Sequence, residues 1–127
     1  MTKVLLVALG GAVGALARYL ISEQTVRLLG SGWPYATLMV NVVGGLAMGL
    51  LFGWLAGLCA ADQERWRLLL AVGLLGGFTT FSAFSLEMML MLERRVYVAA
   101  SIYALSSVAF SITAVFVGIW LARRLFV

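Results

Sequence analysis

Apolar residues fill most of this chain, in four long runs separated by short polar segments. The runs cover residues 4–21, 35–58, 66–92 and 96–122. Each reaches the ~18–20 apolar residues that an α-helix needs to cross a bilayer. The pattern predicts an all-α membrane protein, with four transmembrane helices in a single domain over residues 1–127. The segment 22–34 has room for one further helical turn, at residues 23–29.

The composition supports this class and narrows it. Hydrophobic residues make up 64% of the chain and charged residues only 11%, whereas a soluble domain carries about 25% charged residues. No polar segment is large enough for a separate soluble domain, so we expect membrane lipid to surround the molecule. The first run could be read as a secretory signal, because Ala15-Leu16-Ala17 resembles a cleavage site. We interpret it as a retained transmembrane helix.

The third run contains a segment, GGFTTFSAF at residues 76–84, that does not suit a smooth apolar helix. Glycines weaken a helix, and threonine and serine hydroxyls compete for its backbone hydrogen bonds. In lipid, an interrupted helix is tolerated only where it is buried in protein or lines a water-filled cavity. We therefore expect the third helix to be broken in the middle of the membrane, and the function to lie at this break.

Two helix faces carry polar groups at a spacing of four residues. In the second run, Thr37 and Asn41 begin a stripe that continues as glycines, and small residues at this spacing let helices pack closely. Asn41 must find a partner or meet solvent, either as a link between helices or as an amide donor facing a pore. In the fourth run, Tyr103, Ser107 and Ser111 form a row of hydroxyls that suits an ion or water.

Two charged residues lie inside the runs. Arg18 stands near the predicted end of the first run, where it either extends to the membrane surface, caps a neighbouring helix end or attracts anions to a vestibule. Glu87 follows the segment 76–84 by one turn. Because an isolated carboxylate is costly in a membrane, it either bonds to the hydroxyl rows or carries protons in a transporter.

Basic residues are nearly balanced between the two sides of the predicted membrane protein. The side with both termini carries Lys3, Arg65, Arg67, Arg123 and Arg124, and the other side carries Arg18, Arg27, Arg94 and Arg95. An excess of Lys and Arg in cytoplasmic loops normally sets the orientation of a membrane protein. The near balance predicts insertion in both orientations and an antiparallel homodimer, unless one dominant loop fixes the orientation.

Residues for catalysis are scarce. The chain has no histidine and one cysteine, which excludes a disulfide within the chain and a Cys/His metal site. No acid–base pair or phosphate-binding loop is visible, and no basic run suits nucleic acid. We therefore predict that the protein is not an enzyme, needs no organic cofactor and does not bind nucleic acid.

The whole chain resembles the Fluc (CrcB-type) fluoride channel family. Three segments carry the resemblance: GGAVGALARY at residues 10–19, TLMVNVVG at 37–44 and, most specifically, GGFTTFSAF at 76–84. The resemblance implies a passive, fluoride-selective channel that exports cytoplasmic fluoride across the bacterial inner membrane. It also implies a dual-topology, antiparallel homodimer with two pores.

The resemblance assigns residues to this channel. Asn41, Phe81 and Phe84 would line the pores, together with the hydroxyl row of Tyr103, Ser107 and Ser111. A structural sodium ion would lie on the dimer axis, bound by the backbone carbonyls of Gly76 and Thr79 from both subunits. We expect vestibule or structural roles for Arg18, Thr37 and Glu87.

The chemistry of these groups suits fluoride. A pore must replace the water around this small ion with hydrogen-bond donors, which amides and hydroxyls supply. Aromatic ring edges are positive, and carbonyl oxygens suit sodium. The alternative function is a small dual-topology, proton-coupled multidrug exporter that uses Glu87. That class typically has its membrane carboxylate in the first span, where this chain has none. A purely structural helix assembly would leave the interrupted third run unexplained.

Overall fold

The computed structural model describes residues 1–126 as an all-helical protein. The elements in chain order are α1 (Thr2–Leu29), α2 (Tyr35–Leu55), α3 (Ala60–Trp66), the π-helical stretch η1 (Arg67–Leu75), α4 (Gly76–Phe78), α5 (Phe81–Glu93) and α6 (Tyr97–Phe126). Four helical segments are long and apolar enough to cross a membrane: Thr2–Leu29, Tyr35–Leu55, Ala60–Glu93 and Tyr97–Phe126. These segments confirm the all-α architecture with four long apolar helices.

The first helix is longer than the sequence analysis predicted. Residues 23–29 are not a separate turn, because α1 continues without a break to Leu29. Glu23 and Arg27 lie between the first two apolar runs of the sequence. They form an ion pair one turn apart and thereby support the helix. The helix ends at Gly30, which has a φ of 78° and donates its N–H to the Val26 carbonyl.

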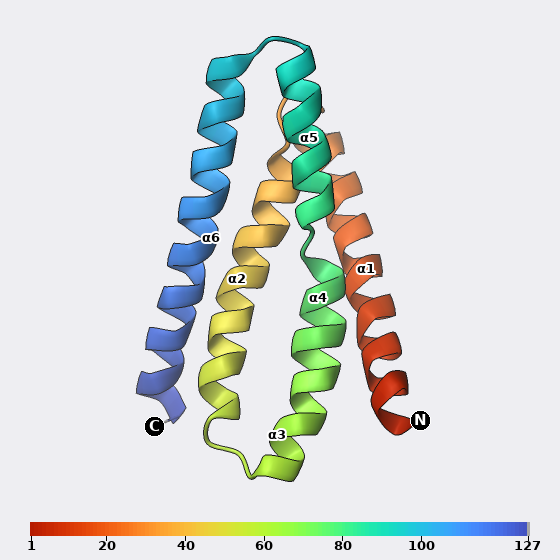
Figure 1. The fold of residues 1–127 in the computed structure, drawn as a ribbon, viewed down its shortest axis with the longest axis vertical. Helices are drawn as coiled ribbons and strands as arrows, with labels where there is room; N and C mark the ends of the chain where they lie inside the picture. Colours follow the sequence, from red (N-terminus) through yellow and green to blue (C-terminus); the bar gives the residue numbers. More distant parts are fainter. Residues whose placement is uncertain (127) are drawn as a thin grey trace.

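The helices form an elongated bundle with a simple up-and-down path (Figure 1). Both termini and the connection between α2 and α3 lie at one end, and the α1–α2 and α5–α6 connections lie at the other. This is the arrangement that four crossings of a membrane require. Between 11% and 28% of the most apolar window of each long helix is buried inside the subunit, which leaves the rest for lipid or a second subunit.

Glycines bring the helix backbones together. The main contacts join α2 to α6, and α1 to η1 and α4. A Cβ added to Gly49 would lie 2.2 Å from the Val115 carbonyl oxygen, and one added to Gly10 would lie 2.2 Å from the Leu69 carbonyl oxygen. Neither atom belongs to a flexible side chain, so no room exists for a methyl group there. The glycine stripe of α2 therefore serves helix packing, as predicted.

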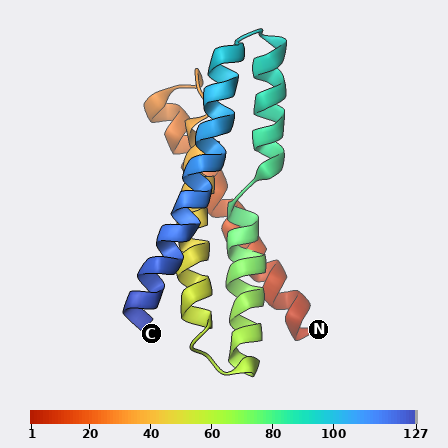
Figure 2. The same ribbon diagram turned by 60° about the vertical axis from the view of Figure 1, so that its left-hand side comes forward.

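The path of the third helical segment changes direction after Phe78. Thr79 and Thr80 have extended backbones, with φ and ψ of −80° and 157° and of −150° and 120°. Figure 2 shows this short connection running obliquely between α4 and α5. Helix α5 then begins at Phe81, and Thr80 caps it because its Oγ1 accepts a hydrogen bond from the Ala83 N–H at 3.2 Å. The interruption lies inside the segment 76–84.

Candidate functional site

Asn41 of α2 holds the extended backbone at Thr80. Its Nδ2 donates to the Thr80 carbonyl at 3.0 Å, and its Oδ1 accepts from the Thr80 N–H at 2.8 Å. In a continuous α-helix that N–H would bond to the carbonyl of Gly76 instead. Asn41 therefore links α2 to the interruption, and its second amide N–H has no hydrogen-bond partner within residues 1–126.

The interruption leaves backbone carbonyls without their helical hydrogen bonds, among them those of Gly76 and Thr79. The N–H groups that would bond the carbonyls of Gly76 and Thr79 are used elsewhere, by Asn41 and by the Thr80 hydroxyl. Over the described part of the chain, these two oxygens accept no other hydrogen bond outside regular helix. Such carbonyl oxygens are suitable ligands for a hard cation such as sodium.

Arg18 lies deeper in the bundle than predicted. Since α1 continues to Leu29, about three further turns follow Arg18, and this residue is not near the end of its span. Its Nε donates to the carbonyl of Gly77 at 3.1 Å. Of the roles considered from the sequence, the capping of a neighbouring helix end is the one present. Without Arg18, the two ends of the bundle carry five and three basic residues.

A groove of about 410 Å³ opens on the surface of the subunit beside the interruption. Its lining includes Asn41, Thr79, Thr80, Phe81, Phe84, Ser107 and Ser111. The fold thus brings together five of the six residues predicted to line a pore. Phe81 is 78% exposed, so its ring faces outward from the subunit. The Ser107 hydroxyl is buried and has no hydrogen-bond partner in the described chain.

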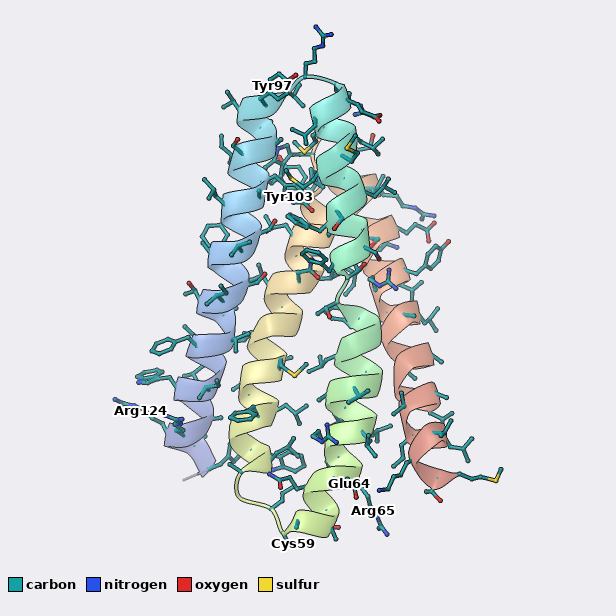
Figure 3. The ribbon with its side chains drawn as sticks, viewed as in Figure 1. Cys59, Glu64, Arg65, Tyr97, Tyr103 and Arg124 are labelled. Atoms are coloured by element: carbon teal, nitrogen blue, oxygen red, sulfur yellow. The ribbon has the colours of Figure 1, made fainter. Side chains whose placement is uncertain are left out.

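Tyr103 does not line this groove. Tyr103 lies on α6, in the half of the bundle that contains α5 (Figure 3). It is completely buried, and its hydroxyl donates to Glu87 Oε2 at 2.6 Å. The Thr37 hydroxyl donates to the other oxygen, Oε1, also at 2.6 Å. Glu87 therefore bonds to hydroxyls of α2 and α6, which is one of the two roles considered for it. The predicted row divides, because Tyr103 turns to the strongest acceptor nearby while Ser107 and Ser111 border the groove.

Sequence reasoning missed two residues. Thr80 received no role, although a threonine followed by a helix-forming run is a common N-cap signal. Trp33, in the α1–α2 connection, packs its ring edgewise on Tyr103 with a centroid distance of 5.4 Å. No sequence signal identifies this contact, because it joins residues of the first loop and the last helix.

The structure has four long apolar helices, an interruption in the third helical segment, and a groove lined by amide, hydroxyl and aromatic groups. These features define a small multi-pass membrane protein whose groove can bind a polar solute. Residues 5–119 match the family described as "CrcB-like protein, Camphor Resistance (CrcB)", and the chain belongs to this family. This match confirms the resemblance seen in the sequence.

Curated relatives cover the whole chain. It is 59% identical over 126 residues to the "Fluoride-specific ion channel FluC" of Caulobacter sp. (strain K31), covering 99% of this chain and 98% of the relative. The protein of that name from Phenylobacterium zucineum (strain HLK1) is also 59% identical, with 99% of both chains covered. The one from Rhizobium leguminosarum bv. trifolii (strain WSM2304) is 47% identical, covering 98% and 99%. These relatives are ion channels and not enzymes or drug exporters, so the exporter alternative has no support.

Proposed function

We propose that this protein is a fluoride-selective passive ion channel that lets cytoplasmic fluoride leave the cell. The observation that carries this proposal is the groove at the interruption, where Asn41, Phe81, Phe84 and Ser107 meet in a chain whose relatives are named fluoride-specific channels. Glu87 accepts hydrogen bonds from two hydroxyls, which supports a structural role for this carboxylate.

The groove supplies the donors that a dehydrated fluoride ion needs. Ser107 and Ser111 border this space, and Asn41 retains one free amide N–H. The rings of Phe81 and Phe84 stand 5.5 Å apart between centroids, tilted by 38°. Their positive edges act as weak donors to a compact anion and exclude bulk water from a narrow passage.

A second subunit completes the conduction path. The groove is open on one side, and the exposed ring of Phe81 lies at its border. An antiparallel homodimer covers this face and forms two equivalent pores, one from each groove. In a dimer with this symmetry, the interruption lies at the middle of the membrane in both subunits.

Dual topology requires its own test, because the position of Arg18 leaves five basic residues against three at the ends of the bundle. This excess is small for a rule that depends on Lys and Arg in the loops. A C-terminal tag should be accessible from both sides of the membrane. Accessibility from one side alone would overturn the antiparallel arrangement.

The same dimer would bind sodium on its axis. The free carbonyls of Gly76 and Thr79, contributed by both subunits, give four oxygens around one cation. Because these carbonyls end α4, their negative partial charges favour a cation there. A fixed positive charge in the membrane also lowers the energy of a nearby anion.

Fluoride enters bacteria as neutral HF, which dissociates in the cytoplasm, so the channel belongs in the inner membrane. A bacterial strain that lacks its own fluoride exporter tests the function in cells. Expression of the wild-type chain should restore growth in fluoride, and Phe81→Ile should restore it poorly. Equal growth with and without the wild-type chain, at matched membrane expression, would contradict the proposed function.

A further inference from the structure

Four aromatic rings form a continuous row from the α1–α2 connection to the groove. Trp33 contacts Tyr103 at a centroid distance of 5.4 Å and an angle of 71°. Tyr103 contacts Phe84 at 5.3 Å and 50°, and Phe84 contacts Phe81 at 5.5 Å and 38°. All three distances fall in the range where aromatic pairs attract each other. The row joins a loop at one end of the bundle to the rings proposed to meet fluoride.

Tyr103 is the member of this row with least freedom to move. It has no exposed surface, and its hydroxyl is held by Glu87. Its ring contacts both Trp33 and Phe84. A shift of this ring would therefore change both the bond to Glu87 and the support behind Phe84.

Trp33 separates Tyr103 from empty space. A second cavity of about 410 Å³ lies between the α1–α2 connection and helices α5 and α6. Trp33 and Glu87 line it, whereas Tyr103, which contacts both, does not. The loop itself is fixed, since the Tyr35 N–H donates to the Trp33 carbonyl at 2.8 Å and the two rings lie 5.3 Å apart.

We propose that Trp33 is a positioning residue for fluoride conduction. It holds the Tyr103 ring against Phe84 and the Tyr103 hydroxyl on Glu87, and so sets the angle of Phe84 in the groove. This inference rests on the proposed channel function. Without the indole, the cavity extends to Tyr103, and side chains that border a void lose the contacts that fix them. The Tyr103 ring then turns toward the vacated space, and Phe84 loses its support.

Trp54 offers a matched control. It also packs edgewise on another indole, that of Trp66, with a centroid distance of 5.8 Å and an angle of 69°. Trp54 lies near the end of α2, and over residues 1–126 its ring pairs with none of the four rings of the row. Loss of its side chain removes a comparable apolar surface without affecting Phe84.

The experiment measures fluoride efflux from liposomes with Trp33→Ala, Trp33→Leu, Trp33→Phe and Trp54→Ala. We expect Trp33→Ala and Trp33→Leu to slow efflux by about tenfold, and Trp33→Phe and Trp54→Ala to stay within about threefold of the wild type. Leucine keeps apolar bulk in the loop but has no ring edge. If Trp33→Ala is not recovered as a folded dimer in size-exclusion chromatography, the efflux of Trp33→Leu therefore tests the role of Trp33.

A double-mutant cycle separates positioning from general support of the loop. Tyr103→Leu removes the ring through which Trp33 would act on Phe84, so adding Trp33→Leu to it should slow efflux by no more than about twofold further. If the two effects multiply instead, Trp33 acts independently of Tyr103 and the inference is wrong. It is also wrong if Trp33→Leu conducts as fast as Trp54→Ala while the wild type conducts. A wild type that fails to conduct would refute the proposed function itself.

Discussion

Replacing Asn41 with alanine tests how the interruption is maintained. The substitution removes both hydrogen bonds to Thr80, which measure 3.0 and 2.8 Å. The freed Thr80 N–H can then bond to the Gly76 carbonyl, which restores a continuous helix. That change would move the segment away from the groove and take one carbonyl from the proposed sodium site.

The size of the effect follows from the two bonds. Each contributes about 1 kcal/mol net, so their loss shifts the balance between interrupted and continuous forms by about 2 kcal/mol. Since 1.4 kcal/mol is a factor of ten, the ratio of the interrupted to the continuous form falls about 30-fold. If only the interrupted form conducts, fluoride efflux from liposomes should slow by up to about 30-fold.

Met39→Ala is a suitable control, because Met39 lies on the same helix with its side chain 41% exposed and outside the groove. It should conduct like the wild type. The reasoning would be refuted if Asn41→Ala conducted within about threefold of Met39→Ala. The two hydrogen bonds between Asn41 and Thr80 would then contribute less than ~0.7 kcal/mol to the conducting form.

Three further predictions follow from the packing and the proposed ligands. Phe81→Ile or Phe84→Ile keeps apolar bulk but removes the positive ring edge, and should slow fluoride efflux by about tenfold or more; unchanged efflux would exclude the rings from the path. Gly10→Ala should abolish the folded dimer in detergent, because its Cβ would lie 2.2 Å from the Leu69 carbonyl oxygen. Gly11→Ala should fold normally, because its Cβ would lie 3.9 Å from the Gly73 carbonyl oxygen, and equal folding of the two variants would contradict this packing. Replacement of sodium by a large organic cation should loosen the dimer and reduce efflux, and an unaltered dimer after complete exchange would argue against the carbonyl site.

The four long helices could be predicted because each apolar run exceeds the length needed to cross a bilayer. The end of α1 could not be predicted from hydropathy, because the polar residues Glu23 and Arg27 end the apolar run while their ion pair supports the continuing helix. The glycines and hydroxyls of the segment 76–84 indicated where regular helix would fail, and the interruption at Thr79 and Thr80 lies there.

The partners of the site residues depend on contacts between distant parts of the chain. Asn41 and Thr80 are 39 positions apart, so the sequence left open whether the amide serves a helix contact or a pore. Periodicity placed Tyr103 on the same face as Ser107, but it could not reveal that Glu87 would turn the phenol away from the groove. Trp33 had no polar or periodic signal at all. Such contacts emerge only when the helices are packed.

Fluoride and chloride efflux from the same liposomes tests the central claim most directly. Vesicles loaded with both anions, reconstituted with the purified wild-type chain and given a potassium ionophore as counter-ion path, should release fluoride rapidly and retain chloride. Asn41, Phe81, Phe84 and Ser107 surround the groove with donors suited to a small, strongly hydrated anion. Release of both anions at the same rate, or of neither, would contradict the account.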